Sequence, residues 1–165
     1  MSSNKKDKKS GMISTNKTVA DNRKAFYEFH IEEKYEAGIQ LTGTEVKSLR
    51  LGQCSLKEAH VGPHKSDIVL INAHIPEYQQ AGQHLQHEPG RIRKLLLHKR
   101  EIDKLLGAVT RGGYTIMPLR LYFNDKGMAK LEIALAKGKQ MHDKRQTEKN
   151  RDWNRDKARI MRDKG

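Results

Sequence analysis

The stretch from residue 114 to residue 136 constrains the fold more than any other part of this chain. Apolar residues alternate partly along 114–123 and again along 129–136, where they share one face. A period of two is typical of a strand with one buried side. Between the two runs stands Asn-Asp-Lys-Gly at 124–127, which favours positive φ and a tight hairpin turn. The sequence therefore predicts two adjacent antiparallel strands.

Further short elements precede this hairpin. Strand-like runs are predicted at 25–31, 35–41 (with a turn signal at 36–38), 54–61 and 68–75. A helix of about two turns is predicted within 43–52, with Thr44 as N-cap and Gly52 as C-cap, and a longer helix at 99–109. Residues 76–90 contain Pro, Gly, Gln and His and are expected to form a mobile loop with a helical turn.

These elements predict a mainly β fold. About six strands with short connections are most economically arranged as a small antiparallel barrel, because closure removes exposed strand edges. Two or three short helices would flank it. A parallel α/β fold would need helices between successive strands, and too few are predicted.

The positive charge of the chain is concentrated at its two ends. The net charge is +13, with seven Lys or Arg against two Asp in residues 1–25 and eleven against five acidic residues in 137–165. The segment between is nearly neutral, with fifteen basic and thirteen acidic residues. Such a balance favours a polyanionic partner, nucleic acid or an anionic membrane surface, over the alternative that charge serves solubility alone.

Three regions are predicted: a disordered basic segment at 1–21, a folded domain at 22–137, and a basic tail at 138–165. The tail has too few large apolar groups to fold alone. Its Trp153, Ile160 and Met161 nevertheless have a spacing that places them on one helical face. We therefore expect a tail that is disordered when free and helical on a partner.

Several other classes of protein are excluded or disfavoured. The N-terminus lacks the apolar stretch of a signal peptide, and no apolar run approaches the roughly 20 residues of a membrane span. The single cysteine, Cys54, fits a reducing cytoplasm and is expected to be a small buried hydrophobe. Eight His without a Cys-x-x-Cys pair do not predict a metal site. Neither a phosphate-binding glycine loop nor a nucleophile signature is present, so we expect no cofactor and no enzymatic activity.

RNA binding is the class that remains. Nine aromatic residues are too few for base after base to stack on aromatic platforms, so recognition of a folded RNA by backbone and shape is expected. Lys47 and Arg50 are three apart on the short helix and could face one partner. The candidate phosphate contacts in the domain are Arg23, Lys24, Lys47, Arg50, Arg91, Arg93 and Lys94.

Short motifs spread in order along residues 22–161 match one known family. They are Asn22-Arg23-Lys24-Ala25, Tyr35-Glu36-Ala37-Gly38-Ile39, Gly43-Thr44-Glu45-Val46-Lys47-Ser48-Leu49-Arg50, Arg93-Lys94-Leu95-Leu96-Leu97-His98, Gly138-Lys139, Asp143-Lys144-Arg145 and Lys157-Ala158-Arg159-Ile160-Met161. Together they make the chain resemble the bacterial small protein B (SsrA-binding protein) family, which binds transfer-messenger RNA.

The resemblance implies an oligonucleotide-binding-type β-barrel that binds the tRNA-like domain of transfer-messenger RNA. It implies delivery of that RNA to stalled ribosomes for trans-translation, in which the protein mimics the anticodon stem and codon. Its partners would be this RNA and the decoding centre and mRNA path of the ribosome. A cytoplasmic monomer that contacts no membrane is expected.

The resemblance also implies roles for single residues. Asn22, Glu36, Leu96 and His98 match positions that contact the tRNA-like domain, with His98 standing where the family has Asn and Lys99 following it. Gln140 stands where the family has the second Lys of a Gly-Lys-Lys motif, and His142 is likened to a base-stacking group in the decoding centre. The tail residues expected to act on the ribosome are Gly138, Lys139, His142, Asp143, Lys144, Arg145, Trp153, Lys157, Arg159, Ile160 and Met161.

Two other readings remain open. One is a general RNA-binding barrel of the translation machinery, similar to a ribosomal protein or an initiation factor. The other is a hydrolase whose site carries no recognisable signature. Deletion of the tail separates the adaptor from a general RNA-binding barrel, because only the adaptor needs the tail after RNA is bound.

Overall fold

The computed structural model describes residues 12–138 together with Arg151 and Arg155. Its strands are β1 (Lys17–Asp21), β2 (Phe29–Ile39), β3 (His60–His64), β4 (Asp67–Ile71), β5 (Arg93–Leu96), β6 (Thr115–Phe123) and β7 (Ala129–Gly138). Its helices are α1 (Arg23–Glu28), α2 (Gly43–Arg50) and α3 (Lys99–Thr110), with one 3-10 turn, η2 (Gln83–Leu85).

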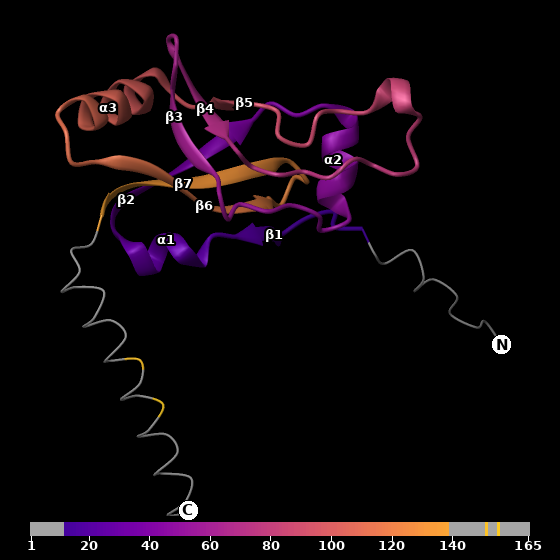
Figure 1. Ribbon diagram of the computed structural model, residues 1–165, viewed down its shortest axis with the longest axis horizontal. Helices are drawn as coiled ribbons and strands as arrows, with labels where there is room; N and C mark the ends of the chain where they lie inside the picture. Colours follow the sequence, from indigo (N-terminus) through magenta and orange to yellow (C-terminus); the bar gives the residue numbers. More distant parts are fainter. Residues whose placement is uncertain (1–11, 139–150, 152–154, 156–165) are drawn as a thin grey trace, which may run out of the picture.

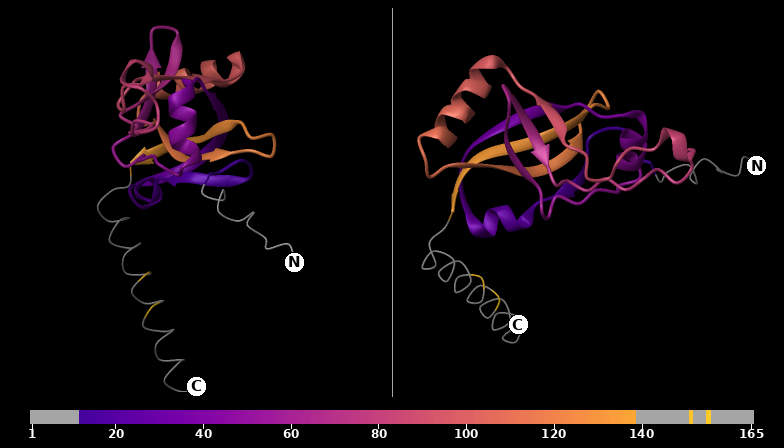
Figure 2. Two further views of the ribbon diagram at one scale, coloured as in Figure 1. Left: turned by 90° about the vertical axis from the view of Figure 1, so that its right-hand side faces the viewer. Right: turned by 45° about the horizontal axis from the view of Figure 1, so that its top comes forward.

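The strands are joined into a closed ring. Within residues 12–138, antiparallel pairings run β6–β3–β4–β5–β2–β7 and return from β7 to β6, while β1 pairs with the part of β6 that β3 leaves uncovered. Helix α2 lies at one end of the ring, and α1 and α3 lie toward the other (Figures 1 and 2). The predicted mainly β, barrel-like fold is confirmed, with seven strands in the described residues where about six were expected.

The hairpin predicted at 114–136 is confirmed as β6 and β7. Phe123 pairs with Ala129 at its closed end. Gly127 has φ +75°, the left-handed conformation that favours glycine. The Asn124 Oδ1 atom accepts hydrogen bonds from the backbone N–H groups of Lys126 and Met128, at 3.0 and 2.9 Å. The turn thus satisfies its own backbone, as the sequence predicted.

The folded part begins earlier than predicted. Residues 17–21, which we expected to be disordered, form β1 and pair with 120–123 of β6. Residues 23–28, which overlap the strand predicted at 25–31, form α1. Helix α1 places Ala25, which is fully buried, against Leu119 and leaves Phe26 about half exposed. A helical turn can bury one side in this way. Six residues are too few to show a repeated helical period, so the sequence did not reveal this helix.

Two further strand boundaries differ from the prediction. Strand β2 continues through 36–38, where a turn was expected, and Gly38 pairs with Leu96 of β5. A Cβ atom on Gly38 would lie 3.2 Å from the Leu96 Cβ, so this glycine permits close approach of two strands. Only His60–His64 is a strand in the region predicted as a strand at 54–61 and a turn beyond it. Ser55 instead forms an isolated bridge with His74.

Helix α2 begins at Gly43, two residues before the start that an N-cap at Thr44 implies. Thr42, rather than Thr44, is its N-cap: the Thr42 hydroxyl accepts a hydrogen bond from the Glu45 N–H, and the Glu45 carboxylate accepts one from the Thr42 N–H. This reciprocal pair is a capping box. Gly52, with φ +78°, follows the helix in the left-handed conformation, so the predicted C-terminal stop is confirmed. Helix α3 agrees with the prediction within one residue.

The core fills the ring from all of its strands. Each buried aliphatic side chain contributes about 1.5–3 kcal/mol, so the ring and the two longer helices depend on one another. Fully or almost fully buried members are Leu49, Leu56, Ile68, Leu70, Ile75, Leu95, Leu105, Ile116, Leu121, Phe123, Leu131 and Ile133.

Candidate nucleic-acid interface

A surface hollow brings Glu36 together with Leu96 and His98, which lie 60 and 62 residues further along the chain. Glu36 of β2, Leu96 of β5 and His98, the residue before α3, line it together, because Gly38 and Leu96 are paired across β2 and β5. We call it the Leu96 hollow. Its full lining is Glu36, Gly38, Leu96, Leu97, His98, Glu101 and Lys130.

The groups in the Leu96 hollow are chemically varied. Leu96 is 48% exposed, unusual for a leucine in a strand. Glu36 accepts a hydrogen bond from the Tyr122 hydroxyl. The backbone N–H of His98 donates to the Glu101 carboxylate at 3.1 Å, which fixes the start of α3. An apolar side chain beside an acceptor, an imidazole and the cation of Lys130 can contact both sugar and base edges of a nucleotide.

A second hollow lies where β1 meets α1. Arg23 and Lys24 are exposed there, and Lys57 adds a third cation. Asn22 is 3% exposed, and its Nδ2 atom donates to the Pro118 carbonyl at 2.9 Å. Asn22 therefore holds the junction of β1 and α1 in place, and its own carboxamide is directed into the protein.

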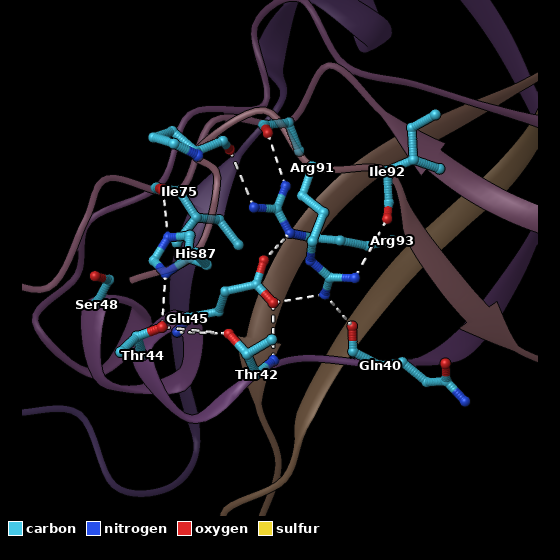
Figure 3. A network of polar contacts seen from close by, with 12 residues as sticks. Gln40, Thr42, Thr44, Glu45, Ser48, Ile75, His87, Arg91, Ile92 and Arg93 are labelled. Carbon is cyan, nitrogen blue, oxygen red and sulfur yellow. Dashed lines mark hydrogen bonds and ion pairs between the residues drawn. The ribbon is translucent and has the colours of Figure 1, made fainter. Parts of the chain in front are cut away.

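Arg93 and Arg91 belong to a buried network centred on Glu45 of α2 (Figure 3). Arg93 is fully buried: its Nε atom donates to Glu45, and its two terminal nitrogens donate to the carbonyls of Ala73 and Pro89 at 2.9 and 3.0 Å. Arg91 donates to Glu45 at 2.6 Å. The prediction that Arg93 contacts phosphate is therefore wrong, because its guanidinium is enclosed and each of its three nitrogens donates to a protein oxygen.

The Glu45 carboxylate is ionised in this setting. Burial alone would raise its pKa, but hydrogen bonds from Arg91, from the Thr42 backbone and from Arg93 hold the pKa below its ordinary value. A buried ion pair of this kind is costly to break, since removal of one partner leaves a buried charge without compensation.

His87 anchors the 76–90 loop beside this network (Figure 3). Its Nε2 atom lies 2.8 Å from the Ile75 carbonyl and its Nδ1 atom 2.9 Å from the Thr44 hydroxyl. Because a carbonyl only accepts, Nε2 carries the proton. The Gln86 carboxamide also binds the Tyr78 backbone: its Oε1 atom accepts from the Tyr78 N–H, and its Nε2 atom donates to the Tyr78 carbonyl. The expected helical turn is present as η2, in a loop that is tied to α2 and to itself.

We expected Lys47 and Arg50 to face one partner. The structure shows that they do not. The Lys47 ammonium is exposed and lies 5.5 Å from the centre of the Tyr78 ring. Arg50 donates to the Ile13 carbonyl at 2.8 Å and stacks on Phe123 at 4.8 Å. Arg50 thus fastens the segment before β1 to the ring, and only Lys47 remains on the surface.

The remaining predicted cations are exposed. Lys94 is paired with Asp67 at 3.4 Å, and Lys99 is the first residue of α3. Gly138 ends β7 opposite Phe29. The other tail candidates, from Lys139 to Met161, lie outside the described residues, as does the prediction of a tail that becomes helical on the ribosome.

The described residues form neither a metal site nor a reactive thiol. In the described residues, no group of three or more His, Cys, Asp or Glu could hold a metal ion. Burial raises the pKa of the Cys54 thiol to about 12, so the thiol stays protonated. No helix in the described part of the chain is long and apolar enough to cross a membrane.

Sequence reasoning missed Glu45, Tyr122 and Lys130. Glu45 lies within the 43–50 motif, yet nothing in a linear pattern showed that its partners lie 46 and 48 residues away. Alternation along β6 and β7 could have placed Tyr122 and Lys130 on the outer face of the hairpin. Their approach to Glu36 depends on strand register, which no pattern supplied.

A closed ring of antiparallel strands with exposed cations and strongly basic ends defines a small RNA-binding β protein. The SmpB protein family model matches residues 19–163. The chain belongs to the SmpB protein family.

Individual relatives agree with this assignment. The SsrA-binding protein of Methylorubrum populi is 58% identical over 149 residues, covering 90% of this chain and 94% of that protein. The SsrA-binding protein of Caulobacter vibrioides is 59% identical over 145 residues, covering 88% and 95%. A solved structure described as "tmRNA-SmpB: a journey to the center of the bacterial ribosome" is 43% identical with a TM-score of 0.61, over 73% of this chain and 84% of that one.

Proposed function

We propose that this protein binds the tRNA-like domain of transfer-messenger RNA and delivers it to stalled ribosomes for trans-translation. The observation that carries the proposal is family membership over residues 19–163, which include both the ring of strands and the basic tail. The protein acts as an adaptor in the cytoplasm and catalyses no step itself. A monomer is sufficient for this role.

The Leu96 hollow is the proposed RNA contact. Glu36, Leu96 and His98 reach one surface from three separate elements. The Glu36 carboxylate accepts hydrogen bonds from ribose 2′-hydroxyl or base amino groups, and Leu96 packs on a sugar or base face. His98 and Lys130 supply hydrogen-bond donors to the sugar-phosphate backbone of the RNA.

Exposed cations outside the hollow supply phosphate contacts. They are Arg23, Lys24, Lys47, Lys94 and Lys99. Arg50, Arg91 and Arg93 are left out of this set because their guanidinium groups bind protein carbonyls and Glu45. Each phosphate contact contributes about −0.9 to the slope of log affinity against log salt on duplex nucleic acid.

The tail is proposed to act after the RNA is bound. Strand β7 delivers it from the edge of the ring beside the start of β2, where Gly138 pairs with Phe29. The ribosome-directed residues are Gly138, Lys139, His142, Asp143, Lys144, Arg145, Trp153, Lys157, Arg159, Ile160 and Met161. Their cations contact ribosomal RNA, and the apolar side chains of Trp153, Ile160 and Met161 enter the mRNA path.

Deletion of residues 138–165 tests the division of labour. Affinity for a synthetic tRNA-like domain should stay within a few-fold of that of the full chain, while tagging on ribosomes stalled without a stop codon should be lost. A second variant, Ile160→Asp with Met161→Asp, changes no basic residue and should spare RNA binding but impair tagging. Equal affinity for the tRNA-like domain and for an unrelated folded RNA would instead indicate a general RNA-binding barrel.

A further inference from the structure

Glu36 occupies an electrostatically unfavourable position on the outer face of the ring. It lies directly opposite Glu132 in the pairing of β2 with β7. Like charges facing each other across a strand pair are destabilising. A carboxylate at such a place needs partners that hold it there, and β6 provides them.

Arg120 and Tyr122 of β6 supply these partners. The Arg120 Nε atom lies 3.7 Å from the Glu132 carboxylate, and the Tyr122 hydroxyl donates its hydrogen bond to Glu36 Oε2. Arg120 thus offsets the charge of Glu132, while Tyr122 binds the neighbouring carboxylate of Glu36.

The Tyr122 ring is itself held in place. The Arg120 guanidinium lies 4.2 Å from the centre of the ring, and its Nη1 atom donates to the Thr18 hydroxyl of β1 at 3.1 Å. A chain of contacts therefore runs from β1 through Arg120 and Tyr122 to Glu36. Burial, and then the hydrogen bond to Glu36, raise the pKa of Tyr122, so the hydroxyl remains a donor at neutral pH.

We propose that Tyr122 is a positioning residue for RNA binding, which orients the Glu36 carboxylate in the Leu96 hollow through its hydroxyl. The inference rests on the proposed function. A hydrogen bond to Oε2 leaves acceptor capacity on a carboxylate, which has two oxygens. Held in one orientation, the carboxylate can meet 2′-hydroxyl or amino donors of RNA. A freely rotating carboxylate would also approach phosphates, which repel it.

The test is a double-mutant cycle on affinity for a synthetic tRNA-like-domain RNA. Tyr122→Phe removes only the hydroxyl and should weaken binding about fivefold to tenfold, within the range of a typical intramolecular hydrogen bond. Glu36→Ala should weaken binding at least as much. If Tyr122 acts through Glu36, Tyr122→Phe has little further effect in the Glu36→Ala background, because the two changes remove one contact.

A matched control is Tyr78→Phe, which removes an exposed hydroxyl that donates to Gln80 at 2.6 Å in the loop beside α2. It should leave affinity unchanged. A second variant, Arg120→Met, keeps the Tyr122 hydroxyl but removes the stacked cation, and it should weaken binding without adding to Glu36→Ala. Thermal unfolding of each variant verifies that the protein is folded at the assay temperature.

The outcomes are distinct. Wild-type affinity for Tyr122→Phe overturns the positioning role, and so does an equal loss in both backgrounds, because Tyr122 would then act independently of Glu36. If Glu36→Ala binds normally, the Leu96 hollow is not the contact and the inference fails with it. If the wild-type protein itself does not bind the RNA, the proposed function fails.

Discussion

Glu45→Gln replaces one carboxylate oxygen by an amide group, yet it should be among the most destabilising conservative substitutions in the domain. The substitution keeps the shape of the side chain but removes its charge. Arg93, which is fully buried, would then lack a counter-charge, and the amide –NH₂ of glutamine cannot accept from a guanidinium. Breaking a buried pair in this way costs about 3–5 kcal/mol. That is a large part of the roughly 5–15 kcal/mol that stabilises a typical domain.

Urea and thermal unfolding followed by circular dichroism measure this cost. A change of 3–5 kcal/mol corresponds to a fall of roughly 10–20 °C in Tm for a domain of this size. The matched control is Glu33→Gln, the same substitution in an exposed pair whose Lys104 Nζ–Glu33 Oε1 distance is 2.7 Å. Exposed pairs contribute about 0–1 kcal/mol, so this control should shift Tm by only a few degrees.

The uncompensated charge of Arg93 can itself be removed. Adding Arg93→Met to Glu45→Gln removes the uncompensated charge and should recover part of the loss. Recovery should be incomplete, because the carbonyls of Ala73 and Pro89 lose their donors. A cost for Glu45→Gln no greater than that of Glu33→Gln would refute the account of Glu45 as the centre of a buried network.

Three further predictions concern stability and RNA binding. Because the folded-state pKa of Glu45 is lowered, its contribution to stability is present above the ordinary value of 4.5 and is lost as pH falls through the folded pKa; acid unfolding of Glu45→Gln should therefore be less steep. Gly127→Ala should lower the free energy of unfolding by about 1–2 kcal/mol, because φ is +75° and a Cβ would lie 3.1 Å from the Ser14 carbonyl oxygen. The control Gly43→Ala, with no atom within 4 Å of its Cβ, should be nearly neutral. Urea unfolding measures both variants. Replacing both Arg23 and Lys24 by Gln should reduce the slope of log affinity against log salt by about 1–2, with Lys104→Gln as the control that leaves it unchanged.

Elements defined by local pattern were predictable from the sequence, and those defined by distant partners were not. The β6–β7 hairpin and α3 carry their own periodicity and stop signals, so their positions were found within a residue or two. Strand β1 exists because β6 offers it an edge, and α1 exists because Ala25 fits against Leu119. Neither of these two long-range contacts can be predicted from the local sequence.

The difference between local pattern and distant partners also separates the buried 43–50 motif from the residues of the Leu96 hollow. In 43–50, the longest of the family motifs, four residues are buried: Thr44, Glu45, Ser48 and Leu49. It is chiefly structural, since Glu45 pairs with Arg93 and Ser48 donates to the Pro76 carbonyl at 2.6 Å. The Leu96 hollow, by contrast, is divided between two motifs, 35–39 and 93–98, that are far apart in the chain. Its residues meet only through the pairing of β2 with β5 and β7.

These two parts are coupled through β5. Arg93 begins the strand that presents Leu96, and its bond to Glu45 ties that strand to α2 while Leu96 faces Gly38. We therefore expect Glu45→Gln, at a temperature where it is still folded, to weaken binding of the tRNA-like domain although Glu45 never touches RNA. The loss should be smaller than for Leu96→Ala and should diminish on cooling, as the ring regains stability. A Glu45→Gln protein with wild-type affinity just below its Tm would mean that the register of β5 is set by strand pairing alone.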